Sequence, residues 1–300
     1  MFDLHNKPLK IIEKRNLWYA LSWAIILIGV GMMAYRALHS RPVLNWGIDF
    51  TGGTSLVFRL DSPPKTSTVK TLQVVRQAVK PFGMEKSVIR MSGNDEISIK
   101  APTLDMGRRG QLVTAIENVV GPVQLLEADL IGPTIGSELR QKSLIIMALV
   151  SVALLGYISW RFEFKFGLSA LIALLHDAFV TLAFASIVGI EINAPFVAAF
   201  LTILGYSIND TIVIFDRIRE NVMATKGHHS YTDIANISVN QTFWRSIATS
   251  STTMLCVLSL LLFGGATLRE FSMVLLVGIL SGTYSSIFIA SPAWVSLNRK

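Results

Sequence analysis

Six long apolar runs constrain this 300-residue chain more than any other feature of its sequence. A helix needs about 20 apolar residues to cross roughly 30 Å of hydrocarbon, and each run is close to that length. Hydrophobic residues make up 51% of the chain and charged residues only 16%, whereas soluble domains carry about 25% charged residues. The sequence therefore predicts an α-helical membrane protein.

The apolar runs predict six transmembrane helices. We expect them at residues 17–37, 143–160, 166–189, 196–215, 246–263 and 271–290. The first run is too long for a cleavable signal peptide and no small-residue cleavage site follows it, so we expect a permanent span. The other segments are a cytoplasmic tail (1–16), an outer domain (41–140), a polar cytoplasmic loop with amphipathic helical pieces (216–245) and a cytoplasmic end (296–300).

Residues 41–140 have the alternation of side chains and the Gly and Pro turns of a soluble domain. Strand patterns at 45–60 and 124–130 flank a helical pattern at 66–80, two further strands within 87–101, and a helical pattern at 105–120. This order, β-α-β-β-α-β, is the ferredoxin-like pattern. The sequence therefore predicts a small α+β ferredoxin-like domain between the first and second spans, outside the cytoplasm.

The net charge of +7 follows from where the basic residues lie. If both termini are cytoplasmic, the short outside turns hold only Arg269. The inside segments then hold Lys7, Lys10, Lys14, Arg15, Arg161, Lys165, Arg217, Arg219, Lys226, Arg245, Arg299 and Lys300. This is the positive-inside asymmetry of membrane proteins. Because no basic string is interleaved with aromatic residues, we do not expect nucleic-acid binding.

An acidic residue, Asp210, lies inside the fourth predicted span, in the run LTILGYSINDTIVIFDRIRE (201–220). The helical rise places it about 7 Å from the middle of the span, on the cytoplasmic side. Ionisable residues at membrane depth are costly and mark ion paths or proton relays. We therefore interpret Asp210 as a proton-binding carboxyl, against the alternative of a solvated carboxylate near the helix end. Tyr206 and Arg217 share its helix face, and Asn209 is its neighbour.

Arg245, at the start of the fifth span, is the candidate cation for Asp210. A long basic side chain can extend toward a group one or two turns deeper. The alternative is a positive-inside anchor at the lipid headgroups, which the position alone favours. Small polar residues make the start of this span suitable for a hydrated path or a helix-packing face: Gln241, Ser246, Thr249, Ser250, Ser251, Thr252 and Thr253.

A second polar pair, His176 and Asp177, lies near the middle of the third predicted span. Two titratable groups at this depth strengthen the case for a proton path. Successive residues of a helix point about 100° apart, so we do not expect the two side chains to share one site. The alternative is that one of them makes a structural hydrogen bond to a neighbouring helix.

Other motifs limit the possible functions. The five histidines are scattered without Cys or acidic ligands at useful spacing, so no metal site is predicted. No nucleotide-binding fingerprint or nucleophile elbow occurs, and TGGT (51–54) is interpreted as a backbone turn. Gly278 and Gly282 form a GxxxG pattern in the last span, which favours close packing of helices.

Taken together, several motifs resemble the SecF family of the bacterial Sec protein-translocation machinery. They are NWGIDFTGGT (45–54), IGPTIGSEL (131–139), HD (176–177), GYSIND (205–210), DRIRENV (216–222) and the stretch from Gln241 through Arg245 to SIATSSTT. They extend over nearly the whole chain, and their combination is specific although each piece is short. The related SecD family has a different glycine motif and a much larger outer region.

The resemblance implies one half of a twelve-helix complex of the resistance-nodulation-division (RND) superfamily in the bacterial cytoplasmic (inner) membrane. Such a complex is not an enzyme, and it uses the proton-motive force, with the proton as coupling ion and no other cofactor, to pull preproteins out of the channel. The family's intramembrane Asp and Arg map onto Asp210 and Arg245. The implied partners are SecD, the SecYEG channel, YajC, the translocating preprotein and membrane lipid.

The motifs that carry the resemblance contain candidate structural residues, which are Gly47, Asp49, Gly52, Gly53, Gly132 and Gly136. We expect the connection 132–139 to carry a change in helix packing to the outer domain. Two alternatives stay open, namely an RND-type exporter of small molecules or lipids and a structural membrane scaffold. The small outer domain argues against the exporter, and the scaffold predicts no effect of Asp210→Asn.

Overall fold

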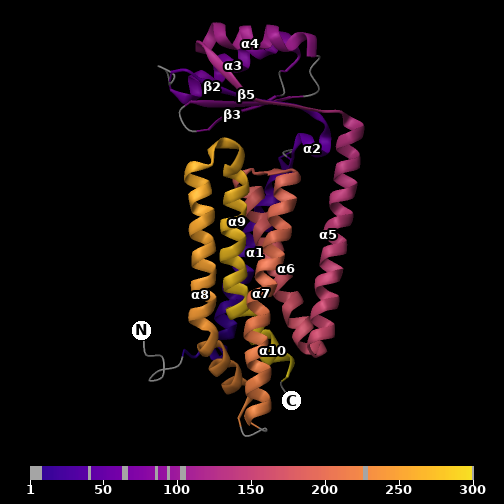
Figure 1. Cartoon of the computed structure of the whole chain (residues 1–300), viewed down its shortest axis with the longest axis vertical. Coiled ribbons are helices and arrows are strands. Elements are labelled where there is room, and N and C mark those ends of the chain that lie inside the picture. Colours follow the sequence, from indigo (N-terminus) through magenta and orange to yellow (C-terminus); the bar gives the residue numbers. More distant parts are fainter. Residues whose placement is uncertain are drawn as a thin grey trace. The chain divides into compact units, whose positions relative to one another are not determined.

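The computed structural model describes residues 9–39, 42–62, 67–84, 87–92, 95–101, 106–225 and 229–298. The chain divides into two compact units. The membrane unit contains Met1–Asn45 and Ile146–Lys300, and the sheet unit contains Trp46–Ile145. Each unit has its own apolar core, and we describe each by itself (Figure 1).

Long helices build the membrane unit, and the N-terminal part of α5 belongs to the sheet unit. Their bounds are η1 (Ile12–Lys14), α1 (Arg15–Leu38), α5 (Pro133–Arg161), α6 (Phe164–Val188), α7 (Ala194–Thr225), α8 (Tyr231–Phe263), α9 (Gly265–Ser285), the π-helical turn η3 (Ser286–Ala290) and α10 (Ser291–Leu297). A two-residue strand, β6 (Glu191–Ile192), separates α6 from α7. In the described residues, six helices are long and apolar enough to cross a membrane, as the sequence predicts.

The amphipathic helical pieces expected within 216–245 are present, but they continue the two flanking spans and do not stand in a separate loop. Helix α7 continues to Thr225, and α8 already begins at Tyr231, after the N-cap Ser230. The polar side chains support this helical hairpin by bonding across it, since Asn221 Nδ2 donates to Ser238 Oγ at 2.8 Å. Buried apolar residues, including Ile218 and Ile234, continue the core between the two helices. The polar composition of 216–245 therefore does not mark the ends of the two helices. It marks the parts of α7 and α8 that extend beyond the apolar spans.

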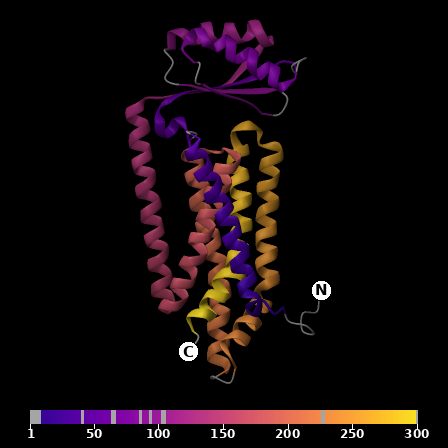
Figure 2. The same cartoon turned by 180° about the vertical axis from the view of Figure 1, so that it is seen from behind.

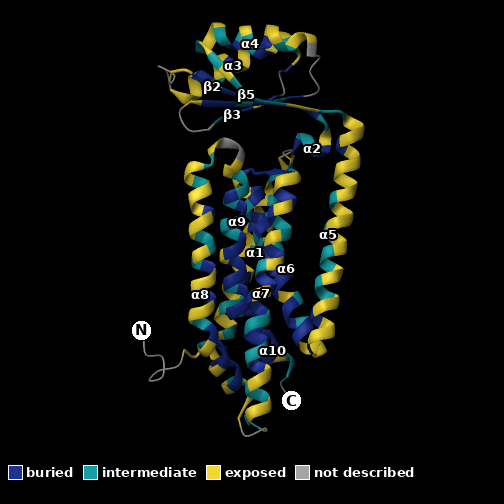
Figure 3. Cartoon of the chain, viewed as in Figure 1, coloured by how far each residue is buried: buried dark blue, intermediate teal, exposed yellow. Residues whose placement is uncertain are grey.

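Burial differs strongly among the helices, as Figure 3 shows. Helix α5 exposes large apolar side chains, including Leu149 and Val152, along most of its length, whereas α6, α7 and the last span, formed by α9, η3 and α10, are the most enclosed. Helix α1 packs on α6, where a Cβ added to Gly29 would lie 2.2 Å from Ala183 Cβ (Figure 2). An exposed apolar helix surface of this kind suits lipid or another membrane helix.

The segment before α1 is held against the start of α8 by two asparagine side chains. Asn236 Oδ1 accepts from the backbone N–H groups of Ile11 and Ile12, and its Nδ2 donates to Glu13. Asn240 both accepts from Leu9 N–H and donates to Leu9 C=O. Amide side chains satisfy both kinds of backbone group, so they can hold this short segment against a helix.

The sheet unit has the ferredoxin-like order that the sequence predicts. Its elements are β2 (Gly53–Leu60), α3 (Thr68–Val79), η2 (Lys80–Phe82), β3 (Val88–Ser92), β4 (Glu96–Ala101), α4 (Met106–Val120) and β5 (Val123–Ile131). The strands pair antiparallel in the order β3-β4-β2-β5, with Leu56 of β2 opposite Ile99 of β4 and Ala128 of β5. Leu56 and Phe58 pack with Val75 of α3 and Leu112 of α4 in the core.

A short helix interrupts the strand predicted over 45–60. It is α2 (Ile48–Thr51), and β1 (Asn45–Trp46) precedes it. Gly47 C=O accepts from the N–H groups of Phe50 and Thr51, which starts this turn, and Asp49 lies within it. Gly52 and Gly53, with φ of 73° and 141°, then turn the chain into β2. Positive φ is costly for residues other than glycine, so the GG pair is needed for this turn.

The two glycine motifs contact each other inside the sheet unit. A Cβ on Gly52 would lie 2.8 Å from Pro133 Cα, and a Cβ on Gly136 would lie 2.7 Å from Gly52 N. Gly132 C=O accepts from Gly136 N–H and begins α5. The first turn of α5 therefore packs directly on the backbone of the GG turn.

Candidate functional site

Polar pairs run along the contact between α7 and α8. Tyr206 Oη lies 3.2 Å from Thr253 Oγ1, and Ser246 Oγ donates to Asp210 Oδ1 at 2.6 Å. Further along the same face, Arg217 Nε donates to Gln241 Oε1 at 2.6 Å. The predicted common face of Tyr206, Asp210 and Arg217 is confirmed, and it is the face of α7 that meets α8. Asn209 is exposed.

Asp210 is a buried carboxyl with one oxygen satisfied and the other unsatisfied. Only 5% of the residue is exposed. Its Oδ1 accepts from Ser246, whereas its Oδ2 is buried and has no hydrogen-bond partner among the described residues. A buried polar atom without a partner is costly and calls for a physical explanation. Protonation of Oδ2 would remove the negative charge while the hydrogen bond from Ser246 to Oδ1 is kept.

The proposed partner of Asp210, Arg245, does not form an ion pair with it. No N–O distance of 4.0 Å or less joins the two residues in the described part of the chain, and the Arg245 side chain is exposed. The guanidinium is still near enough to interact electrostatically with the carboxylate. Arg245 directly precedes Ser246 on α8. Ser246, which is uncharged, therefore makes the contact with Asp210 that the sequence suggested for Arg245.

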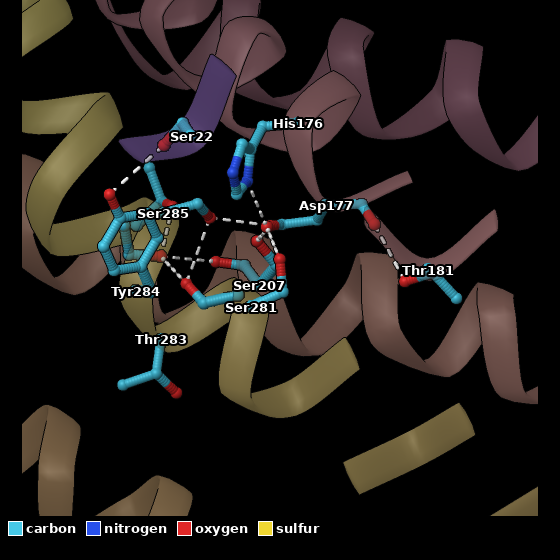
Figure 4. A network of polar contacts seen from close by, with 12 residues as sticks. Ser22, His176, Asp177, Thr181, Ser207, Ser281, Thr283, Tyr284 and Ser285 are labelled. Atoms are coloured by element: carbon cyan, nitrogen blue, oxygen red, sulfur yellow. Dashed lines mark hydrogen bonds and ion pairs between the residues drawn. The ribbon is translucent and has the colours of Figure 1, made fainter. Parts of the chain in front are cut away.

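A second polar cluster surrounds Asp177 of α6, and Figure 4 shows it from close by. Asp177 is fully buried. Its Oδ1 accepts from Ser281 at 2.6 Å and lies 3.1 Å from His176 Nδ1. Its Oδ2 accepts from Ser207 and Ser285, each at 2.6 Å. Both carboxylate oxygens are therefore satisfied, by residues from α6, α7 and α9.

His176 and Asp177 share one site, contrary to the prediction from their helical offset. The offset of about 100° describes the directions of the Cα–Cβ bonds, and rotation about the side-chain bonds lets the two groups meet. The His176 ring also lies near the ring of Tyr284, with the two ring centroids 5.8 Å apart. Its Nε2 is buried without a described partner.

The serines that complete this cluster were not found by sequence reasoning. Ser207 lies in the GYSIND motif, but it faces Asp177 and not Asp210. Ser281 and Ser285 belong to the run SGTYSS (281–286), an unbroken series of small or polar residues inside the last span. That run was the available signal, because polar residues in membrane helices usually bond to a neighbouring helix.

Close packing of α9 on α7 brings these groups together. A Cβ on Gly278 would lie 2.1 Å from Ile203 Cδ1, and a Cβ on Gly282 would lie 2.9 Å from Ser207 Cβ. The prediction from the GxxxG pattern is therefore confirmed. Side chains at these two positions would separate the helices and lengthen the hydrogen bonds to Asp177.

The two clusters are connected through α7 and α9. Thr211, next to Asp210, lies with its hydroxyl 2.8 Å from that of Ser286, and Ser286 also contacts the C=O of Ser207 at 3.2 Å. Within the described residues, no three His, Cys, Asp or Glu side chains gather as a metal site would require. The chemistry that this arrangement can carry is the gain or loss of a proton at a buried carboxyl.

Comparison with known proteins identifies the family. A model of the C-terminal region of the protein export membrane proteins SecD and SecF matches residues 111–300, and a SecD/SecF GG motif model matches residues 42–64. The protein translocase subunit SecF of Sebaldella termitidis is 40% identical over 292 residues, which cover 97% of this chain and 92% of that protein. The chain belongs to the SecF family of protein translocase subunits. SecF of Escherichia coli O157:H7 is 33% identical, over 93% of this chain and 86% of its own.

Solved structures agree with this assignment. The crystal structure of SecDF from Thermus thermophilus, a translocon-associated membrane protein, superposes with a TM-score of 0.87 at 33% identity. The match covers 100% of this chain and 40% of the SecDF chain, so the present chain spans less than half of that protein. A second SecDF structure, in a super-membrane-facing form, gives a TM-score of 0.68 at 32% identity. The chain is thus a multi-pass membrane protein of RND type with a small β-sheet domain.

Proposed function

We propose that this SecF-family chain works with SecD as a subunit of the Sec protein translocase that is driven by the proton-motive force. In this proposal it assists the late stages of preprotein translocation through SecYEG, and Asp210 is the group that binds and releases the proton. The observation that carries the proposal is the half-satisfied carboxyl of Asp210, buried between two spanning helices. Ionisable groups in such positions mark ion paths.

The cost of keeping Oδ2 unpaired supports this role for Asp210. Leaving a buried acceptor unsatisfied costs on the order of 1–3 kcal/mol, so a purely structural site would be expected to supply a second donor. Asp177, in the same unit, has such donors on both oxygens. A proton on Asp210 Oδ2 needs no displacement of a protein donor, whereas a proton on Asp177 would have to replace one.

A partner half is supported by the exposed apolar surface of the membrane unit. Helices α1 and α5 carry large unburied apolar side chains, including Trp23 and Leu149. Six helices are half of what a transporter built from two parallel repeats contains. The SecDF structures, whose chain is longer than this one, suit a SecD half as the missing part. A place for YajC in the complex rests on the family resemblance alone.

Proton entry can drive a conformational change of modest size. One charge crossing the membrane releases about 2.3 kcal/mol for each 100 mV. Loss of the Asp210 charge would end its attraction to Arg245 and weaken the hydrogen bond from Ser246, because a charge-assisted bond becomes a neutral one. Helices α7 and α8 could then shift against each other. In the proposed orientation both termini are in the cytoplasm of a bacterium and the sheet unit is outside, as the positive-inside asymmetry favours.

The test is proton-dependent release of a preprotein from membrane vesicles that carry the whole Sec complex. Asp210→Asn should abolish the part of release that depends on the proton-motive force while the subunit accumulates normally. Asp216→Asn is the matched control on α7, because within the described residues Asp216 forms only a partly exposed 3.4 Å ion pair with Arg161, and such pairs contribute little. Full release by Asp210→Asn would refute the proposal and favour a structural scaffold.

A further inference from the structure

One short polar segment, at the end of α9 and the start of η3, bonds to four other helices, namely α1, α6, α7 and α8. In this segment, Ser281–Ser286, Ser281 and Ser285 bond to Asp177 of α6, and Tyr284 Oη donates to Trp18 C=O of α1. Thr283 and Ser250 of α8 are joined by a hydroxyl–hydroxyl bond of 2.6 Å, and Ser286 is bonded to Thr211 of α7. The π-helical turn η3 begins at Ser286, and such turns are frequent at functional sites.

Two of these contacts hold the helices that form the Asp210 site. Ser286 is bonded to Thr211, the residue that follows Asp210 on α7. Thr283 is bonded to Ser250, which lies four residues, or about one turn, after Ser246 on α8. The two helices that carry the short Ser246–Asp210 bond are therefore both bonded, close to that site, to the same segment, Ser281–Ser286.

In the part of α8 that follows Arg245, the rotation of the helix about its own axis depends on few contacts of this kind. Much of its apolar surface is exposed, including Leu255 and Leu262, so close packing constrains the helix on one side only. At the level of the membrane, its described side-chain bonds to α7 and α9 are Ser246–Asp210, Ser250–Thr283 and Thr253–Tyr206. Since 100° of rotation separates successive residues, a small turn of α8 would move Ser246 away from Asp210.

We infer that Thr283 is a positioning residue for the proposed proton site: its bond to Ser250 fixes the rotation of α8 that directs Ser246 Oγ at Asp210 Oδ1. This inference rests on the proposed role of Asp210 and extends it to a residue that does not touch the carboxyl. Ser286 acts in parallel, by holding the α7 side of the same bond. The segment 281–286 thereby links the Asp210 site to the Asp177 cluster.

The variant Thr283→Val tests this inference, because it removes the hydroxyl and nearly keeps the shape of the side chain. The first readout is the infrared carbonyl band of protonated Asp210 in the purified complex at acidic pH, assigned by its absence in Asp210→Asn. A carbonyl that loses a hydrogen-bond donor absorbs at higher frequency. We expect the band to shift upward in Thr283→Val, in the same direction as in Ser246→Ala, and to return in Thr283→Ser.

The second readout is proton-dependent preprotein release. Thr283→Val should lower it by roughly threefold, the factor that corresponds to an average interhelical hydrogen bond in a membrane protein. Thr283→Ser should restore it. The matched control is Thr252→Val, because Thr252 is exposed and its hydroxyl bonds only to Thr249 C=O of its own helix in the described structure.

Ser250→Ala removes the other hydroxyl of the same bond. It replaces Thr283→Val as the test if Thr283→Val does not accumulate in the membrane. It should match Thr283→Val, and the double variant should be no worse than either single variant, as expected when two side chains act through one contact. The inference is overturned if Asp210→Asn abolishes proton-dependent release while Thr283→Val and Ser250→Ala leave both readouts as in Thr252→Val. If Asp210→Asn itself has no effect, the proposed function fails first.

Discussion

Helix α7 has two polar faces that are built in different ways. Toward α9, glycines allow close backbone contact, and Ser207 helps to satisfy a carboxylate that has donors on both oxygens. Toward α8, the polar pairs are spaced along the helix, and the carboxyl of Asp210 has a donor on one oxygen only. The first face has the features of a fixed contact, and the second has an acceptor that is still available.

The difference shows that burial alone does not distinguish the two carboxyls. Asp177 is more deeply buried than Asp210, yet its hydrogen bonds are complete. Fully satisfied networks rigidify and specify one core arrangement, whereas a buried polar group without a partner is costly. The number of donors on each oxygen is therefore the more informative quantity.

The largest effect on stability is expected from Asp177→Ala. The substitution removes the common acceptor of three serines and the partner of His176, and it leaves these groups buried and unpaired. We expect the free energy of unfolding to fall by at least about 3 kcal/mol. Denaturation of the purified complex in detergent measures this loss. Asp210→Asn should cost clearly less, and equal losses would contradict the distinction between the two faces.

A smaller effect is expected from Gly278→Ala on the α9 side of α7. The added Cβ would lie 2.1 Å from Cδ1 and 2.3 Å from Cγ1 of Ile203, which is itself buried and cannot move aside freely. Overpacking of this kind costs about 1–3 kcal/mol. The matched control is Gly156→Ala in α5, where nothing lies within 4 Å of the new Cβ. Thermal unfolding of both variants should show a lower midpoint for Gly278→Ala only.

The smallest change in stability is expected from Ser246→Ala, on the α8 side. This variant removes the donor to Asp210 Oδ1 and leaves the carboxyl without a described partner. Interhelical hydrogen bonds in membranes contribute on average about 0.6 kcal/mol, so the unfolding free energy should change little. Proton-dependent release should nevertheless fall several-fold. A large loss of stability without a change in release would show that this face is structural as well.

Much of the fold could be predicted because it follows from composition and period. Stretches of about 20 apolar residues predicted the six spans. The order of the strand and helix patterns predicted the ferredoxin-like order of the sheet unit. The helix ends could not be placed, since the polar residues of 216–245 favour a loop by composition. Pairs such as Asn221–Ser238, which make the hairpin helical, form only in the folded protein.

The sequence predicted which residues belong to the candidate site better than it predicted which of them contact each other. Asp210 was recognisable because a carboxyl interrupts an apolar run, and so were His176 and Asp177. Which partner each acid has depends on the rotation of α8 and α9. Sequence spacing therefore pointed to Arg245, whereas the rotation of α8 brings Ser246 to Asp210. Serines 281 and 285 were missed because small hydroxyl residues are also common as simple packing residues.

The central claim, that Asp210 is the carboxyl that changes its protonation, is tested most directly by infrared difference spectroscopy. The spectrum of the complex at acidic pH minus that at neutral pH should contain a buried carboxyl band. That band should disappear in Asp210→Asn and persist in Asp216→Asn. A difference spectrum that is the same in the wild type and in Asp210→Asn would contradict the account.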